Sequence, residues 1–346
     1  SSLIDRIDGG SILVAEVTEK SWGPNYLRFG RGLSSDSQAN SFFNLLASHR
    51  WTWLNSLGAE WRNDLQVGRN DRASTEWYQP LTERQRVFVA ARAELTRDPF
   101  DIYDDDGMRL ARFRREAYEY GLDIGTPLGT KGEARLGVLR GRVKLVNDTN
   151  LLGQAIPLPD VDSGGVRLRV ALDALDNLRF PRSGYLGELV LYNSERALGA
   201  TDSYTKGSFT WTQAVAHGAH SVQLGLSFGG NLARNGDLPD YEVFTLGGFL
   251  HLSGYKTNQF TGSEMSFGRL IYNYRLSGPT LLDGSYVGAS AELGRIGESA
   301  FGRDRSELRR GFSLYFAFDT PLGPVYLAYG RADSQNQAAY FFLGLP

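Results

Sequence analysis

Residues 311–319 read Gly-Phe-Ser-Leu-Tyr-Phe-Ala-Phe-Asp, and every second side chain in this stretch is large and apolar. Phe312, Leu314, Phe316 and Phe318 fall on one face of an extended chain, whereas Ser, Tyr, Ala and Asp fall on the other. Alternation with a period of two is typical of a β-strand that has one apolar and one more polar face. The stretch therefore predicts a strand.

The same alternation recurs along most of the chain, for example in residues 166–173 and 221–228. We find about sixteen candidate strands and no persuasive amphipathic helix. A content of 41 glycines in 346 residues fits strands and turns better than long helices. The candidate strands lie near residues 25–34, 39–50, 55–68, 72–79, 84–97, 108–125, 132–147, 163–174, 184–195, 204–215, 219–233, 263–276, 282–296, 310–320, 323–332 and 338–345.

Composition excludes several classes of protein. With no cysteine, the chain has neither disulfides nor thiolate metal sites. The balance of 37 basic and 39 acidic residues argues against a nucleic-acid partner. No run of about 20 apolar residues forms a spanning helix, and the opening at Ser1 lacks the apolar core of a signal peptide. A transmembrane β-barrel stays possible because only alternate residues of its strands face lipid.

The connections between the candidate strands favour a barrel over a soluble β-protein. Those after even-numbered strands are short, whereas those after odd-numbered strands tend to be longer and polar, as at 98–107, 148–162, 234–262 and 297–309. Short turns at one end and long loops at the other are typical of outer-membrane barrels, and aromatic residues near strand ends fit interfacial girdles. We therefore predict an all-β, 16-stranded antiparallel transmembrane β-barrel, integral to the bacterial outer membrane, with both termini periplasmic.

Three motifs resemble the outer-membrane protein 85 superfamily, also called the bacterial surface antigen family, whose members insert or translocate proteins at outer membranes. Residues 319–324 and the aromatic-rich end resemble the penultimate turn and the C-terminal strand of that family. Residues 176–184 resemble its periplasmic turn, D-N-x-x-F-P-x-x-G, with Asp176, Asn177, Phe180, Pro181 and Gly184 at the motif positions. Residues 246–255 resemble its G-G-x-x-x-V-R-G-F/Y loop, with Leu246, Gly247, Gly248, Leu252, Ser253, Gly254 and Tyr255 at the motif positions.

The resemblance implies that the loop at about 234–262 folds back into the lumen. Ser253 stands where the family has an arginine that contacts acidic residues of the inner wall. We therefore expect that charge contact to be lost, while Gly254 and Tyr255 still turn and wedge the loop. The sequence Leu-Ser-Gly-Tyr fits the patatin-like subgroup, in which a lipase passenger, one POTRA domain and the barrel form one chain.

By this resemblance, residues 1–20 would be the remnant of a POTRA domain and residues 21–346 the barrel. The barrel would export and anchor a fused N-terminal passenger, a patatin-like lipase, by type V secretion. The implied partners are the chain's own POTRA domain and passenger, outer-membrane lipid and lipopolysaccharide, the barrel-assembly machinery and a possible second copy. An assembly factor for other outer-membrane proteins and a passive porin-like channel are the alternatives. No cofactor is implied.

Export would require the barrel to open where its first and last strands meet. An unpaired strand edge can be extended by an incoming strand. Gly344 and Pro346 should lie in the last strand, where proline cannot donate a ladder hydrogen bond, so the seam should be short. The residues predicted to form this seam are Tyr26, Leu27, Phe29, Tyr340, Phe341, Phe342 and Leu343.

Motifs that suggest chemistry have simpler explanations here. Residues 225–229 match the G-x-S-x-G elbow of hydrolases, but Ser227 lies in an alternating strand without a following helix. Asp8 precedes Ser227, the reverse of the patatin order. His217 and His220 flank a tight turn and lack a third ligand, so we predict neither a catalytic nor a metal site. The arginines considered for lipopolysaccharide or lumen contacts are Arg112, Arg114, Arg115, Arg303, Arg305, Arg309 and Arg310.

Overall fold

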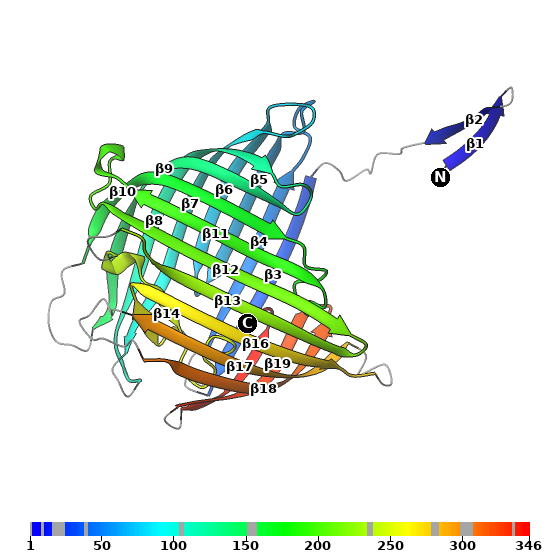
Figure 1. Ribbon diagram of the computed structural model, residues 1–346. Coiled ribbons are helices and arrows are strands. Elements are labelled where there is room, and N and C mark those ends of the chain that lie inside the picture. The colour runs from blue at the N-terminus through cyan, green and yellow to red at the C-terminus, as the bar shows by residue number, and fades with distance from the viewer. Residues whose placement is uncertain are drawn as a thin grey trace.

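Sixteen antiparallel strands form a closed barrel in the computed structural model of the chain (Figure 1). The structure describes residues 2–7, 10–15, 25–37, 41–103, 107–150, 158–233, 238–277, 284–297, 307–333 and 336–346. Consecutive strands pair around the barrel, and β20 closes it against β3. The barrel strands are β3 (Asn25–Asp36), β4 (Ser41–Trp51), β5 (Glu60–Gly68), β6 (Asp71–Pro80), β7 (Phe88–Tyr103), β8 (Arg109–Pro127), β9 (Gly132–Asn150), β10 (Asp160–Asp173), β11 (Gly184–Ser194), β12 (Tyr204–His217), β13 (His220–Asn231), β16 (Glu264–Arg275), β17 (Ser285–Gly297), β18 (Arg309–Thr320), β19 (Gly323–Ala332) and β20 (Gln337–Leu343).

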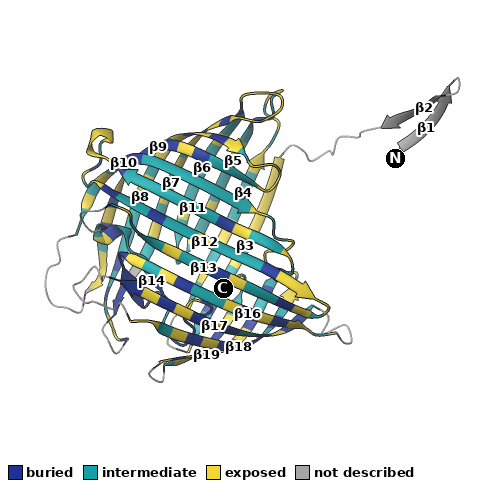
Figure 2. Ribbon diagram, viewed as in Figure 1, coloured by how far each residue is buried: buried dark blue, intermediate teal, exposed yellow. Residues whose placement is uncertain are grey.

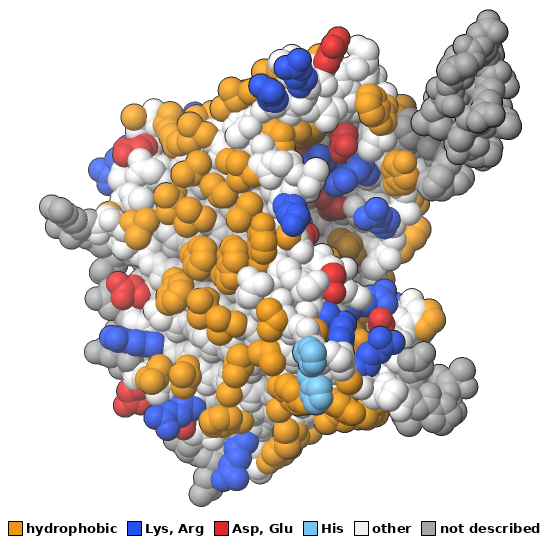
Figure 3. Space-filling model, turned by 45° about the vertical axis from the view of Figure 1, so that its right-hand side comes forward, with side chains coloured by type: hydrophobic (Ala, Val, Ile, Leu, Met, Phe, Trp, Pro, Cys, Tyr) orange, Lys and Arg blue, Asp and Glu red, His pale blue; other side chains and the backbone are white. Residues whose placement is uncertain are grey.

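The predicted fold class is confirmed, and the register shows why the sequence alternates. Phe312 lies opposite Ala291 on β17 and Arg331 on β19, so the same outward face continues from strand to strand. Leu314 is 67% exposed, whereas Ala317 on the inward face is fully buried. Burial alternates in the same way along many strands (Figure 2). Hydrophobic side chains cover much of the outer wall, and charged ones gather near its ends and inside the mouth (Figure 3).

Aromatic residues also stand in register at the end of the barrel that carries the termini. Trp51 on β4 lies opposite Trp61 on β5, which lies opposite Trp77 on β6. All three side chains are exposed on the outer wall. Their alignment forms part of a belt of the kind that marks a membrane interface.

The connections differ from the sequence expectation. Residues 98–103 of the predicted loop 98–107 belong to β7, and residues 148–150 and 160–162 of the predicted loop 148–162 belong to β9 and β10. Both connections are therefore shorter than predicted. At the end opposite the termini, the connection at 232–263 is 32 residues long, whereas β5 and β6 are joined by two residues. Most of the expected difference in connection length between the two ends of the barrel therefore comes from one long connection.

The N-terminal segment forms a separate small sheet. β1 (Ser2–Ile7) pairs antiparallel with β2 (Gly10–Ala15), and Asp8 lies outside the described residues. The assignment of residues 1–20 to a POTRA remnant stays a prediction. Among the residues that the structure describes, no helix is long and apolar enough to cross a membrane.

Candidate functional site

The long connection between β13 and β16 folds into a hairpin inside the barrel. It contains a short helix, η2 (Asp240–Glu242), and two paired strands, β14 (Phe244–Leu246) and β15 (Phe260–Gly262). Gly247, Gly248 and Gly254 have φ values of 129°, 105° and 103°, which side chains rarely tolerate. These glycines of the loop motif therefore shape the tip, residues 247–258.

A single carboxylate of the inner wall holds this tip. Glu292 on β17 accepts hydrogen bonds from the backbone N–H groups of Leu252 and Ser253, at 2.7 and 2.6 Å. The Ser253 hydroxyl donates to the other oxygen of Glu292 at 2.7 Å, and Ser290 also donates to it. Ser253 and Glu292 are at most 1% exposed. The buried charge is thus satisfied by four donors.

Position 253 supplies no charge, as expected, but hydrogen bonds replace the charge contact with the acidic wall residue. Ser253 keeps that contact through its hydroxyl and its backbone, without a guanidinium. The nearby cation comes from the wall, because Arg269 on β16 lies directly opposite Glu292 and donates to the Leu250 carbonyl oxygen at 3.3 Å. The positive charge is therefore on the barrel rather than on the loop.

Glycines of the inner wall allow the tip to lie against the strands. A Cβ at Gly311 on β18 would be 2.7 Å from the Ser253 nitrogen. A Cβ at Gly330 on β19 would be 2.8 Å from the Gly254 nitrogen. Real Cβ atoms do not approach backbone atoms so closely. The absence of a side chain at both positions is therefore required for this packing.

The tip also contacts the last strand. Gly254 donates its N–H to the hydroxyl of Tyr340 on β20 at 2.8 Å, and that hydroxyl donates to the Tyr255 carbonyl oxygen at 3.3 Å. The Phe249 ring lies 5.4 Å from the rings of both Tyr340 and Phe342. Tyr255 is itself buried and packs edge-on against Phe260. The loop motif is thus bonded to one side of the seam.

The predicted turn motif reaches the same aromatic cluster from the other end of the barrel. Phe180 is 4% exposed and stacks on Tyr286 of β17 at 4.2 Å between ring centroids. It also lies 5.6 Å from Tyr326, which in turn lies 5.9 Å from Phe249. Two motifs that are about 70 residues apart in sequence therefore meet in one hydrophobic core.

Hydrogen bonds hold the turn in this shape. The Asp176 carboxylate accepts the backbone N–H groups of Arg182 and Ser183, and Asn177 accepts that of Arg179. Burial acts to raise the pKa of Asp176, but these backbone donors outweigh it and the pKa is lowered. Gly184 has a φ of 95°, and Pro181 is buried beside Phe180. Arg179 pairs with Asp319 at 2.7 Å across the mouth.

The base of the loop is tied to the opposite wall by an ion-pair group. Glu242 of η2 pairs with Arg115 on β8 and with Lys206 on β12, each at 2.9 Å. Tyr241 donates its hydroxyl to Asp202 at 2.8 Å. Burial acts to raise the pKa of Glu242, but Lys206 and Arg115 outweigh it and hold that pKa below 4.5. The loop is therefore attached at its base as well as at its tip.

We expect this base attachment to weaken in acid. The folded-state pKa of Glu242 lies below the unfolded value. The contribution of ionised Glu242 to the free energy of unfolding is therefore complete above pH 4.5 and is lost as the pH falls through the folded-state pKa. The gap in unfolding temperature between the native chain and Glu242→Gln should be present at pH 7 and should close at low pH. Heat-modifiable gel mobility measures the unfolding temperature of each protein at both pH values. A difference in unfolding temperature that does not change with pH would contradict this expectation.

The seam between β20 and β3 is the shortest pairing in the barrel. It contains four residue pairs, from Tyr340–Asp36 to Leu343–Leu33, against seven in β5–β6 and β19–β20. β20 ends at Leu343, so Gly344 and Pro346 follow the last strand and do not lie in it, contrary to the sequence expectation. Gly344 has a φ of 110° and lies close to the backbone of Arg31 and Gly32.

The seam pairs differ from those that the sequence suggested. Tyr340, Phe341, Phe342 and Leu343 do lie on it. On β3, however, the seam partners are residues 33–36, whereas the register partners of Tyr26, Leu27 and Phe29 lie on β4. Residues 25–32 thus form a β3 edge beside the end of β20. Phe29 on this edge is 78% exposed.

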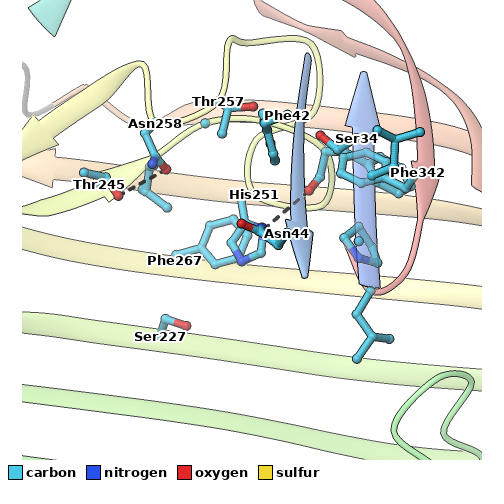
Figure 4. A pocket seen from close by; sticks show the side chains of 18 of the residues that line it. Ser34, Phe42, Asn44, Ser227, Thr245, His251, Thr257, Asn258, Phe267 and Phe342 are labelled. Carbon is cyan, nitrogen blue, oxygen red and sulfur yellow. Dashed lines mark hydrogen bonds between the residues drawn. The ribbon is translucent and has the colours of Figure 1, made fainter. Parts of the chain in front are cut away.

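A cavity of about 430 Å³ lies between the loop tip and the inner side of this seam (Figure 4). Ser34 and Phe42 approach it from β3 and β4, His251 and Thr257 from the tip, and Phe342 from β20. Ser227 of the G-x-S-x-G match also lines it, but β13 continues as a strand to Asn231. The strand–turn–helix context of a nucleophile elbow is not present at Ser227. His217 and His220 pair across the β12–β13 turn.

The wall opposite the aromatic cluster carries paired charges. Asp123 on β8 is 4% exposed and lies 3.2 Å from Arg92, 3.7 Å from Arg167 and 3.9 Å from Arg135. Arg135 pairs in turn with Glu76. The lumen is therefore divided into an aromatic and glycine-rich side that holds the loop and a charged side.

Sequence reasoning did not identify Glu292, Gly311 and Gly330 as parts of the site. An acidic residue on the inward face of a barrel strand looks like any polar lumen residue. The available signal was the run of small residues on the inward faces of β17 to β19. That run comprises Gly288, Ser290, Gly294, Gly311, Ser313 and Gly330.

Comparison with solved structures places the fold among known barrels. BamA from Haemophilus ducreyi, in a crystal structure lacking POTRA domains 1-3, matches with a TM-score of 0.71 and 12% identity over 99% of this chain and 74% of that chain. CdiB from Escherichia coli matches with a TM-score of 0.58 and 14% identity over 99% of this chain. The chain spans 66% of the length of CdiB. No curated protein matches the sequence.

The family model of the Omp85 superfamily domain matches residues 54–345, which include the turn motif, the loop motif and the last strand. Barrels of this family are integral outer-membrane proteins. The chain therefore belongs to the Omp85 superfamily.

Proposed function

We propose that this barrel exports a polypeptide fused on its N-terminal side and anchors it at the outer membrane by opening at the β3–β20 seam. The observation that carries this proposal is the four-pair seam beside the β3 edge at residues 25–32. At such an edge, the backbone N–H and C=O groups that point away from β4 can pair with an incoming strand. Opening requires fewer ladder bonds to break here than between any other two strands of the described barrel.

The loop would control this opening. Its tip is bonded to Glu292 on β17 and to Tyr340 on β20, and it packs on Phe342. Displacing the tip would remove packing from the last strand and weaken the seam. The function is thus mechanical, and we propose that the residues present here carry no catalytic activity.

The sequence motif supports a proposal for the identity of the passenger. The Leu-Ser-Gly-Tyr motif at residues 252–255 is similar to that of patatin-like type V secretion proteins. We therefore propose a patatin-like lipase as the passenger, a POTRA domain between passenger and barrel, and assembly of the barrel by the barrel-assembly machinery. Because β20 runs antiparallel to β3, both chain ends leave the barrel at one end, which we assign to the periplasm.

A disulfide across the seam tests the proposal. Ser35 on β3 and Phe341 on β20 are register partners. The native chain has no cysteine, so two introduced cysteines can form a disulfide only with each other. With Ser35→Cys and Phe341→Cys oxidised, display of a passenger fused to the N-terminus should fall at least tenfold, and a reductant should restore it. The matched control, Leu65→Cys with Ala73→Cys, locks the β5–β6 pair instead and should leave display unchanged. Protease treatment of intact cells measures display.

The BamA-like fold makes assembly of other outer-membrane proteins the second candidate. The same oxidised seam variant distinguishes the two. If the level of other barrels in the membrane falls while display of the fused passenger continues, the chain is an assembly factor. Normal display with a fully oxidised seam would overturn export through this seam.

A further inference from the structure

Five arginines surround one cavity at the rim of the barrel opposite the termini. The cavity has a volume of about 490 Å³. It lies at the two-residue turn between the short strands β5 and β6, where the barrel wall is shorter than at the neighbouring long strands β7 to β9. Two aspartates, Asp71 and Asp148, are the acidic residues of its lining. We call this cavity the arginine notch, and its cationic residues are Arg69, Arg97, Arg109, Arg112 and Arg114.

Ion pairs hold Arg112 and Arg114 of the notch in place and leave each guanidinium with further N–H donors. Asp101, which is 3% exposed, binds Arg112 through two hydrogen bonds at 2.7 and 2.8 Å. Arg114 pairs with Glu116 at 2.9 Å and with Asp148 at 3.1 Å. The Arg97 side chain is 61% exposed. A guanidinium has five N–H donors, so these pairings fix the side chains and leave donors for a ligand.

An apolar groove of about 560 Å³ adjoins the notch on the outer wall. The two cavities share Asp71 and Arg97 in their linings. Leu65, Val67 and Leu95 line the groove and are 51%, 48% and 58% exposed. Arg97 follows Leu95 by two residues on β7, so both project to the lipid-facing side of the wall. Ala73, Ala117 and Tyr118 also line the groove.

More cations stand at the edge of this groove. Arg142 and Lys144 on β9 line it, and Arg142 is held by Asp160 at 2.6 Å. A ligand that lay across both cavities would therefore meet eight basic and four acidic residues beside a strip of exposed aliphatic side chains. This combination matches an amphiphile with more than one anionic group and several acyl chains, since one phosphate would use a small part of the donors.

We propose that the arginine notch binds the phosphorylated disaccharide headgroup of an outer-leaflet glycolipid of the lipid A type, whose acyl chains lie in the adjoining groove. The position of the notch in the outer leaflet rests on the orientation given under the proposed function. The binding chemistry does not depend on it. Bidentate guanidinium–phosphate contacts supply the specificity, and the groove supplies apolar area.

Binding to the purified, folded chain in detergent tests the proposal without any passenger. Bis-phosphorylated lipid A is titrated into the native chain and into Arg97→Gln/Arg114→Gln, with bound lipid measured by native mass spectrometry. The double variant should bind on the order of tenfold more weakly, because two charge-assisted contacts are lost. Arg295→Gln/Arg331→Gln, on the outward face of β17 and β19, is the matched control and should bind like the native chain.

Three outcomes would overturn the proposal. They are equal binding by the notch variant and the native chain, equal binding of lipid A lacking its phosphates, and equal binding of phosphatidylglycerol, which has one phosphate and two acyl chains. Heat-modifiable mobility confirms that each variant is folded. If the double variant does not fold, Arg97→Gln alone is used, and a loss of about threefold is expected because the Arg97 side chain is more exposed than that of Arg114.

Discussion

Glu292→Ala should release the loop tip from the wall and lower the free energy of unfolding by on the order of 4 kcal/mol. The substitution leaves the N–H groups of Leu252 and Ser253 and the Ser253 hydroxyl without their acceptor, in a place where both residues are at most 1% exposed. Each buried donor without a partner costs about 1–3 kcal/mol. Protease cleavage within residues 247–258 should become fast in the folded barrel.

The choice of substitution separates the hydrogen bonds from the charge. Glu292→Gln keeps one carbonyl oxygen for the two backbone donors, so it should destabilise the barrel less than Glu292→Ala does. Glu188→Ala is the control, because Glu188 pairs with Arg169 on the exposed inner wall and does not bind the loop. Unfolding temperature by heat-modifiable mobility measures all three. A Glu292→Ala barrel that is as stable and protease-resistant as the native one would refute this account of the loop.

Gly311→Ala should have the second large effect, through steric displacement of the tip. The new Cβ would lie 2.7 Å from the Ser253 nitrogen and 3.0 Å from the Leu252 carbonyl carbon, and both are backbone atoms that cannot rotate away. The tip must therefore move off the wall and lose its bonds to Glu292, at a cost of about 2–4 kcal/mol. The seam should loosen as well, since the tip also binds Tyr340.

Gly268→Ala on β16, which is separated from β18 by β17, is the matched control. Its Cβ would meet its nearest neighbour, the Leu226 side chain, at 3.6 Å, an ordinary contact. It should be neutral or slightly stabilising, because alanine is less flexible than glycine in the unfolded chain. Equal stability and equal protease resistance of the two variants would show that the tip does not require glycine at position 311.

The strands could be predicted from sequence wherever one of their faces meets an apolar environment. Phe312 to Phe318 show this pattern because alternate residues of β18 face outward. The rim parts of β7 and β9, residues 98–103 and 148–150, were missed because their side chains do not alternate between apolar and polar. Backbone pairing continues there without the hydrophobic signal that marks a strand.

The site was harder to predict because its contacts join distant segments. The turn and loop motifs could be found by resemblance, but the meeting of Phe180 with Phe249 around Tyr326 depends on closure of the whole barrel. The register of β20 against β3 at the seam also depends on closure of the whole barrel. The aromatic strand at residues 340–343 was found, whereas its partners at 33–36 are fixed by where β20 ends relative to β3. Local patterns do not carry that information.

A line of neighbouring rings runs from Phe180 through Tyr326 and Phe249 to Phe342 and so joins the mouth to the seam. Linkage is reciprocal, so if release of Phe180 lowers the free energy needed to separate β20 from β3, opening the seam must favour release of Phe180 by the same amount. Under the proposed export function, a chain that displaces Phe180 at the mouth would thereby make the seam easier to open before it reaches the seam.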